Sequence, residues 1–336
     1  MNPMRPELGR NPKGSAPINI RDVRIHLLAD HRESILQASK LSPRRSAIEI
    51  VLSASACIAV IAIGVSGIKT GWWWTAPATI LLIAALQHRL SILQHESIHN
   101  LLFGHPALND MIGLYIIGPS IGAMPAFSRR AHLSHHAHLG TEQDMESAPY
   151  QTAPKTRKEF AIWSLLKISG LESAFRLVQL SGHAPGPKNM VPKPTNPPER
   201  PHDKSLDWLS LVCVQGSLAA AFALTCGIGY YILFWVAPLL TVTRYLMGIR
   251  SMVEHAEKEM VTDPETRFTN TIHCGELEGF FFGPLRFNYH AEHHLFPKVP
   301  SWRWPSLKDQ FSRHAAFRSV VRVHRSYIGS LAGSLK

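Results

Sequence analysis

The chain has 336 residues, of which 45% are hydrophobic and only 18% are Asp, Glu, Lys or Arg. Its 35 Lys and Arg residues outnumber its 24 Asp and Glu residues and give a formal net charge of +11; there are also 19 His and four Cys. The charged fraction is lower than soluble domains usually have, the scattered cysteines form no C-x-x-C pair of a zinc ribbon or disulfide framework, and no nucleic-acid-binding motif accompanies the basic charge.

Four long apolar runs predict membrane-spanning helices. Residues 1–45 are polar and basic, with no early apolar core, so we expect no cleaved signal peptide. The runs that follow cover residues 47–68, 72–93, 208–226 and 228–249, and each is long enough to cross a bilayer. Short turns join them in pairs. The expected fold is therefore an all-α integral membrane protein with four transmembrane helices in two hairpins and a cytosolic helical cap.

The distribution of positive charge predicts the orientation. Among the Lys and Arg residues, only Lys69 falls in a short turn on the far side of the expected spans. Because Lys and Arg concentrate in cytoplasmic loops, both termini and residues 94–204 are expected in the cytoplasm. The predicted organisation is a cytosolic basic segment at 1–45, a membrane domain at 46–310 with its cap at 94–204 and 250–310, and a cytosolic basic tail at 311–336.

The predicted cap contains three unusual segments. Residues 111–127 are apolar but broken by Gly and Pro, and a crossing there would separate histidines that must share one site, so we expect a re-entrant or interfacial segment. Residues 160–180 mix apolar and charged side chains, as a helix lying on the membrane surface does. Residues 182–201 hold seven prolines and should form an irregular linker.

Three histidine clusters, HESIH, HLSHH and HAEHH, carry the chemistry. Histidines four residues apart share one helix face, and imidazole is a good ligand for iron, zinc and copper. A single H-x-x-x-H is usually a surface or core feature, but eight clustered imidazoles on one side of a membrane exceed the need of one four-coordinate ion. We therefore predict a two-metal site. Its candidate ligands are His95, His99, His132, His135, His136, His290, His293 and His294.

These clusters, their spacing and their membrane context resemble the membrane fatty acid desaturase superfamily, which includes related hydroxylases. The resemblance covers about residues 45–310. It extends to FGHPALND at 103–110, which is similar to the stretch after the first box, and to TEQD at 141–144, which is similar to the acidic segment after the second. The sequence NYHAEHHLFP at 288–297 closely resembles the third box.

The resemblance implies two iron ions and a ninth histidine ligand after the fourth span. His255 fits that position, and His273 is the rival candidate. In acyl-CoA desaturases an Asn one helical turn earlier contacts the metal through water, whereas Ser251 stands there in this chain, which argues against an acyl-CoA substrate. Polar side chains near the boxes are candidates to orient imidazole N–H groups; they are Glu96, Asp144, Glu254, Asn288 and Glu292.

The resemblance also implies that O2 is the cosubstrate and that an unactivated C–H bond of a lipid chain is oxidised. Desaturation of a fatty acyl lipid is the leading hypothesis; the alternative is a hydroxylase or ketolase acting on a lipid, carotenoid or other hydrophobic natural product. A zinc hydrolase and a metal transporter are further hypotheses, and a transporter should carry more ionisable groups inside its spans. Electrons are expected from a separate ferredoxin or b-type cytochrome with its reductase, and no nucleic-acid partner is expected.

Overall fold

The computed structural model of the protein describes residues 19–180, 204–255, 263–266 and 268–336. The proline-rich linker predicted at 182–201 lies outside these residues, as do residues 1–18 of the polar segment predicted at 1–45. The first helix, α1 (Ile20–Ala38), begins where the Asn19 side chain accepts a hydrogen bond from the backbone N–H of Asp22. The Asp22 side chain returns a bond to the Asn19 N–H, which completes a capping box.

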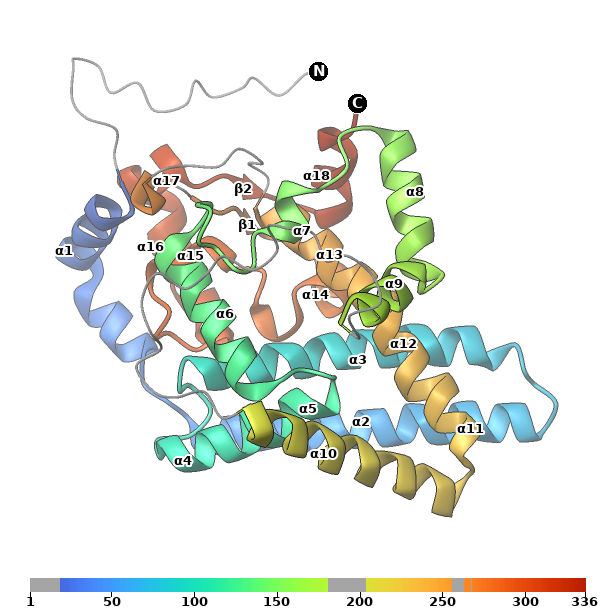
Figure 1. The fold of residues 1–336 in the computed structure, drawn as a ribbon. Helices are drawn as coiled ribbons and strands as arrows, with labels where there is room; N and C mark the ends of the chain where they lie inside the picture. The colour runs from blue at the N-terminus through green and yellow to red at the C-terminus, as the bar shows by residue number, and fades with distance from the viewer. Residues whose placement is uncertain (1–18, 181–203, 256–262, 267) are drawn as a thin grey trace.

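Among the residues that the structure describes, four helices are long and apolar enough to cross a membrane, which confirms that expectation. The first two are α2 (Pro43–Lys69) and α3 (Thr75–Ile98), which lie side by side in the lower half of Figure 1. Gly64 allows their close approach, because a Cβ there would meet the Thr79 side chain. The third is α10 (Lys204–Thr225). The fourth runs from Ile228 to Glu254 and comprises α11 (Ile228–Tyr231), a π-helical turn (Ile232–Val236), α12 (Ala237–Leu240) and α13 (Val242–Glu254).

The segment predicted to be re-entrant or interfacial is helical and sharply bent. It contains α4 (Pro106–Asn109), a π-helix (Asp110–Ile117) and α5 (Gly118–Ser120), and it is followed by α6 (Pro125–His138). Gly122 provides a positive φ of 74° at the bend, where other residues would be strained. The two halves meet at 100°, so they do not form one straight crossing.

The remaining elements lie above α2 and α3 as drawn in Figure 1, along much of the length of these two helices. They include α7 (Ala148–Gln151), α8 (Arg157–Ile168) and α9 (Leu171–Leu180), then α14 (Glu276–Phe282) and α15 (His290–Leu295), with 3₁₀ turns at Pro264–Thr266, Pro284–Arg286 and Ser301–Ser306. The chain ends with α16 (Lys308–Arg313), α17 (Ala315–Val320) and α18 (Tyr327–Ser334). One departure from the all-helical expectation is a short parallel pair, β1 (Thr271–Ile272) with β2 (Val323–His324).

The predicted C-terminal tail, residues 311–336, packs against the rest of the protein. Phe311 and Phe317 are fully buried in an apolar cluster with Val23 and Leu27 of α1. Tyr327 is fully buried against residues of α13. These contacts fix both the first and the last described helices around the region that holds the histidines.

Candidate metal centre

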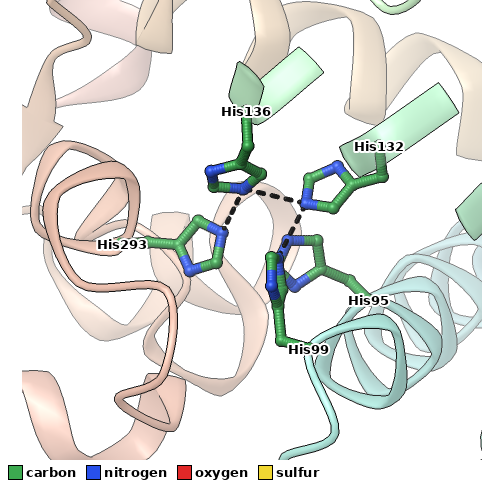
Figure 2. Close-up of side chains that lie close together, drawn as sticks. All are labelled: His95, His99, His132, His136 and His293. Atoms are coloured by element: carbon green, nitrogen blue, oxygen red, sulfur yellow. Dashed lines mark hydrogen bonds between the residues drawn. The ribbon is translucent and has the colours of Figure 1, made fainter. Parts of the chain in front are cut away.

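Nine histidines come together in two groups. The first group is His95, His99, His132, His136 and His293; the second is His135, His255, His290 and His294. Within each group, one potential ligand nitrogen from every ring lies within 4.8 Å of all the others. Figure 2 shows the first group, with rings from α3, α6 and α15 pointing toward one another. Each group has the side-chain chemistry and the spacing to hold a metal ion.

The spacing of the H-x-x-H-H boxes explains why two groups form. On α6, His132 and His136 are four residues apart and both face the first group, whereas His135 faces the second. On α15 the arrangement is reversed: His290 and His294 face the second group and His293 faces the first. Each helix therefore contributes imidazoles to both groups and holds the groups next to each other.

The Nε2 atoms converge at the centre of each group. In the first group, His132 Nε2 lies 3.0 Å from both His99 Nε2 and His136 Nε2. In the second, Nε2 to Nε2 distances of 3.1 Å join His135 to His255, His255 to His290 and His290 to His294. The rings thus present one nitrogen inward and leave Nδ1 for partners outside the group.

Several Nδ1 atoms face oxygen acceptors, as the ligands of metal sites usually do. His135 Nδ1 lies 2.9 Å from Asp144 Oδ1, and His290 Nδ1 lies 3.4 Å from Glu254 Oε2. His255 Nδ1 lies 3.2 Å from the backbone oxygen of Ser251. Two of the predicted orienting side chains, Asp144 and Glu254, therefore lie directly behind imidazoles of the second group.

The other three predicted orienting residues are placed differently. Glu96 Oε1 lies 3.9 Å from His95 Nδ1, while its Oε2 accepts a hydrogen bond from the Ser301 N–H. The carboxylate of Glu292 accepts from the Thr271 hydroxyl. The Asn288 amide donates to the Ile272 carbonyl at 2.6 Å and so fixes the strand β1 beside the third box.

Sequence reasoning missed three residues that support the groups. Glu146 lies behind His132, with Oε2 3.0 Å from Nδ1. The Tyr150 hydroxyl donates to Asp144, and its ring stacks on His255 at a centroid distance of 4.7 Å. The Tyr327 hydroxyl donates to Glu254 Oε1 at 2.7 Å. The acidic stretch after the second box could have indicated Glu146, but no local pattern indicates the two tyrosines.

Burial keeps most of these rings neutral, which is the state that binds metals. Burial, reinforced by the charges of His132 and Lys298, lowers the pKa of His99 to about 2. Burial and neighbouring histidines also lower the pKa values of other ring members; these are His136, His255, His290, His293 and His294. For His135, burial also acts to lower the pKa, but the hydrogen bond and charge of Asp144 outweigh it and raise the pKa.

The donor geometry of the second group fits a metal ion. Asp144 and the Ser251 carbonyl can only accept, so His135 and His255 donate their Nδ1–H outward and a neutral ring leaves a lone pair on Nε2. These two Nε2 atoms face each other at 3.1 Å. Lone pairs at that distance repel unless a proton or cation lies between them, and one central cation would satisfy all four Nε2 atoms of the group together.

The rival and flanking histidines lie outside both groups. The His273 ring is tilted against the Tyr289 ring, with ring centroids 5.3 Å apart, and burial lowers the pKa of His273 to about 4. His88 is buried on α3 with Nδ1 2.8 Å from the Phe281 carbonyl. His105 and His138 are not members of either group. The geometry therefore places His255, and not His273, among the converging rings.

Comparisons with known proteins show which family this chain resembles. A family model described as fatty acid desaturase matches residues 71–326. Dihydrorhizobitoxine desaturase of Bradyrhizobium elkanii is 27% identical over 68% of this chain and 66% of its own length. Acyl-lipid (8-3)-desaturase of Rebecca salina is 25% identical over 81% of this chain and 66% of its own length. Sphingolipid delta(4)-desaturase DES1 of Drosophila melanogaster is 29% identical over 74% of this chain and 72% of its own length. The chain thus spans just under two thirds of the length of the first two relatives.

Proposed function

The chain belongs to the fatty acid desaturase family, and we propose that it is a di-iron enzyme that uses O2 to introduce a double bond into a fatty acyl or related lipid chain. Family membership makes it an oxidoreductase of lipid metabolism, and its four long apolar helices accord with a membrane protein. The observation that carries the di-iron proposal is the convergence of nine imidazoles in two adjoining groups. One ion would be held by each group.

The residues of this chain have separate roles in that proposal. When bound, the two irons supply the activation of O2 and the oxidation of an unactivated C–H bond. The nine histidines would hold the ions, and Asp144 and Glu254 would orient rings of the second group from behind. Desaturation removes two hydrogens from the chain, and a further electron pair from an external donor completes the reduction of O2 to water. The donor we propose is a separate ferredoxin or b-type cytochrome with its reductase.

The substrate is proposed at the level of its class. The relatives carry names that specify an acyl lipid, a sphingolipid and dihydrorhizobitoxine, so the family site accommodates different head groups. The acyl lipid and the sphingolipid share an extended, largely apolar chain. A hydroxylase or ketolase is the second candidate, because the same residues would serve it, and analysis of the product distinguishes an alkene from an alcohol or ketone.

The proposed membrane arrangement follows the charge distribution. We propose that the four spans form two hairpins, that the cap carrying the histidines is cytosolic and that both termini are cytosolic. A reporter fused after Lys336 should then be accessible only from the cytoplasm. An external reporter would contradict the four-span arrangement and the union of the histidine boxes on one side.

Two measurements test the proposed chemistry. Protein purified from an iron-replete host should contain about two irons per chain, since two groups of imidazoles are present. Mass spectrometry of total lipids from cells with and without the protein should reveal a product lighter by two hydrogens. An iron content near one, or zinc in native preparations, would contradict the di-iron centre. An oxygenated product would select the second candidate.

A further inference from the structure

The helices α8 and α9 form a hairpin that exposes large apolar side chains. We call these side chains the hairpin face; they are Ile162, Leu165, Leu166, Ile168, Leu171 and Phe175. Leu165 is 68% exposed and Phe175 is 56% exposed. A concentration of exposed apolar side chains on one short hairpin indicates a site of contact with a protein or a membrane.

The opposite side of the hairpin is fixed against the fourth candidate span. Trp163 packs over Gly248 of α13, where a Cβ would lie 2.7 Å from the indole ring. The helix is interrupted at Thr241, between α12 and α13, and the Ser173 hydroxyl donates to the Leu240 carbonyl at that break. Figure 1 shows α8 and α9 beside α12 and α13. The hairpin face therefore continues the outer surface of the fourth span.

Three cations and one carboxylate gather where the hairpin meets this span. Glu172 is shared, because its Oε2 accepts from Lys167 and its Oε1 from Arg176. Arg244 of α13 is exposed and forms no ion pair with any residue that the structure describes. Lys167 also reaches α13, because a Cβ on Gly248, one turn beyond Arg244, would lie 3.4 Å from Lys167 Cε. In keeping with this placement, burial and the charges of Arg244 and Arg176 lower the pKa of Lys167, while Glu172 acts to raise it. The cluster keeps an excess of positive charge.

The position of Arg244 along the span corresponds to the head-group layer. It lies sixteen residues beyond Ile228, the start of the fourth span. At about 1.5 Å per residue this is roughly 24 Å, close to the far edge of a hydrocarbon core of about 30 Å. His255 lies farther along the same direction, so the cluster faces the leaflet nearest the metal centre. Basic side chains at this depth reach phosphate groups of that leaflet.

We propose that Arg244, Lys167 and Arg176 bind the phosphate head group of an anionic membrane phospholipid whose acyl chains pack on the hairpin face. Charge complementarity selects an anion, because among the described residues the three cations have only one carboxylate beside them and Arg244 forms no ion pair with it. The adjoining apolar surface, continuous with the fourth span, selects a lipid as the source of that anion. The site concerns lipid binding alone and is independent of the proposed oxidation chemistry.

Native mass spectrometry of the full chain tests this site. The protein in detergent is titrated with phosphatidylglycerol or with phosphatidylcholine of the same acyl chains, and bound lipids are counted. The wild type should bind phosphatidylglycerol in preference to phosphatidylcholine. Arg244→Gln should bind it about fivefold more weakly, the effect expected of removing one cation near an anionic lipid surface, and Arg244→Lys should retain most of the binding. Arg318→Gln is the matched control, because Arg318 is exposed on the distant helix α17.

The possible outcomes separate the sources of the phosphate. Equal binding of the two lipids, or equal loss in Arg244→Gln and Arg318→Gln, would overturn the proposal. Displacement of phosphatidylglycerol by an equal concentration of inorganic phosphate would identify a site for the free anion and also overturn it. The iron content and thermal unfolding of Arg244→Gln should match those of the wild type, so a failure of the di-iron proposal leaves this result interpretable.

Discussion

The two histidine groups differ in what lies behind their rings. In the second group, the carboxylates of Asp144 and Glu254 have side chains that are 0% exposed, and each is held by further hydrogen bonds. In the first group, the carboxylate behind His132 belongs to Glu146, whose side chain is 40% exposed. Removal from water strengthens a hydrogen bond and fixes its geometry. The second group is therefore the more rigidly supported of the two.

Packing takes a larger part in orienting the first group. Neither ring nitrogen of His95 has a hydrogen-bond partner among the described residues. The ring is instead enclosed by Phe287, at a centroid distance of 4.4 Å, and by the rings of His132 and His293. The comparison indicates that a buried hydrogen bond orients His135 in the second group, whereas contacts between rings orient His95 in the first. Substitutions can test that division.

The largest effect is expected from removing one ring of either group. His99→Ala and His255→Ala should each lose iron and nearly all turnover, because each deletes a converging nitrogen. His273→Ala should keep most of both, since His273 lies outside the groups. Iron content and turnover of the three variants, measured side by side, decide the matter. Loss of iron in His273→Ala with retention in His255→Ala would move the ninth ligand to His273 and remove His255 from the second group.

A smaller effect should distinguish the carboxylates behind the groups. Asp144 accepts from His135 and also from Tyr150 and the Gly140 N–H. Burial acts to raise its pKa, but these partners outweigh burial and hold it at about 2. Asp144→Asn should weaken iron binding by about 10- to 100-fold, the usual range for residues that orient metal ligands. Glu146→Gln should weaken iron binding only a few-fold, because water competes with the hydrogen bond of this partly exposed side chain.

Iron dissociation into a chelator, followed for each variant, measures this difference. Membrane insertion should be unchanged in both, since it depends on the apolar runs. An equal loss of iron affinity in the two variants would show that burial of the carboxylate does not decide how much it contributes to iron binding. A larger loss in Glu146→Gln would reverse the comparison between the groups.

The sequence predicts local features of the site better than its distant contacts. The helical repeat determines which histidines of a box share a face, so a box alone indicates convergent rings. The division of each box between two groups depends on how α6 and α15 face each other, which no local pattern contains. Likewise, the four apolar runs predict the long helices, whereas the hydrogen bond between Tyr327 and Glu254 joins residues 73 positions apart. That all nine histidines bind iron stays a prediction.

The smallest expected effect tests the outermost support of the second group. Tyr327, on the C-terminal helix α18, donates to Glu254 Oε1, and Arg250 donates to Oε2 at 2.8 Å. The backbone of α18 is itself anchored, because the Tyr327 N–H donates to Glu278. Tyr327→Phe removes one of the two donors to a buried carboxylate that faces His290. The loss should be about 1–2 kcal/mol, seen as several-fold faster iron release with only a modest fall in turnover.

Tyr231→Phe provides the matched control. Its hydroxyl donates to Gln215 Oε1 at 2.6 Å, between the third and fourth spans and away from the histidines. Removing that hydroxyl should lower thermal stability by a similar amount while leaving iron release unchanged. If both variants release iron equally fast, the effect of Tyr327 reflects general stability. If Tyr327→Phe releases iron no faster than the wild type, Arg250 alone suffices to hold Glu254, and the hydrogen-bonded support of the second group ends at α13.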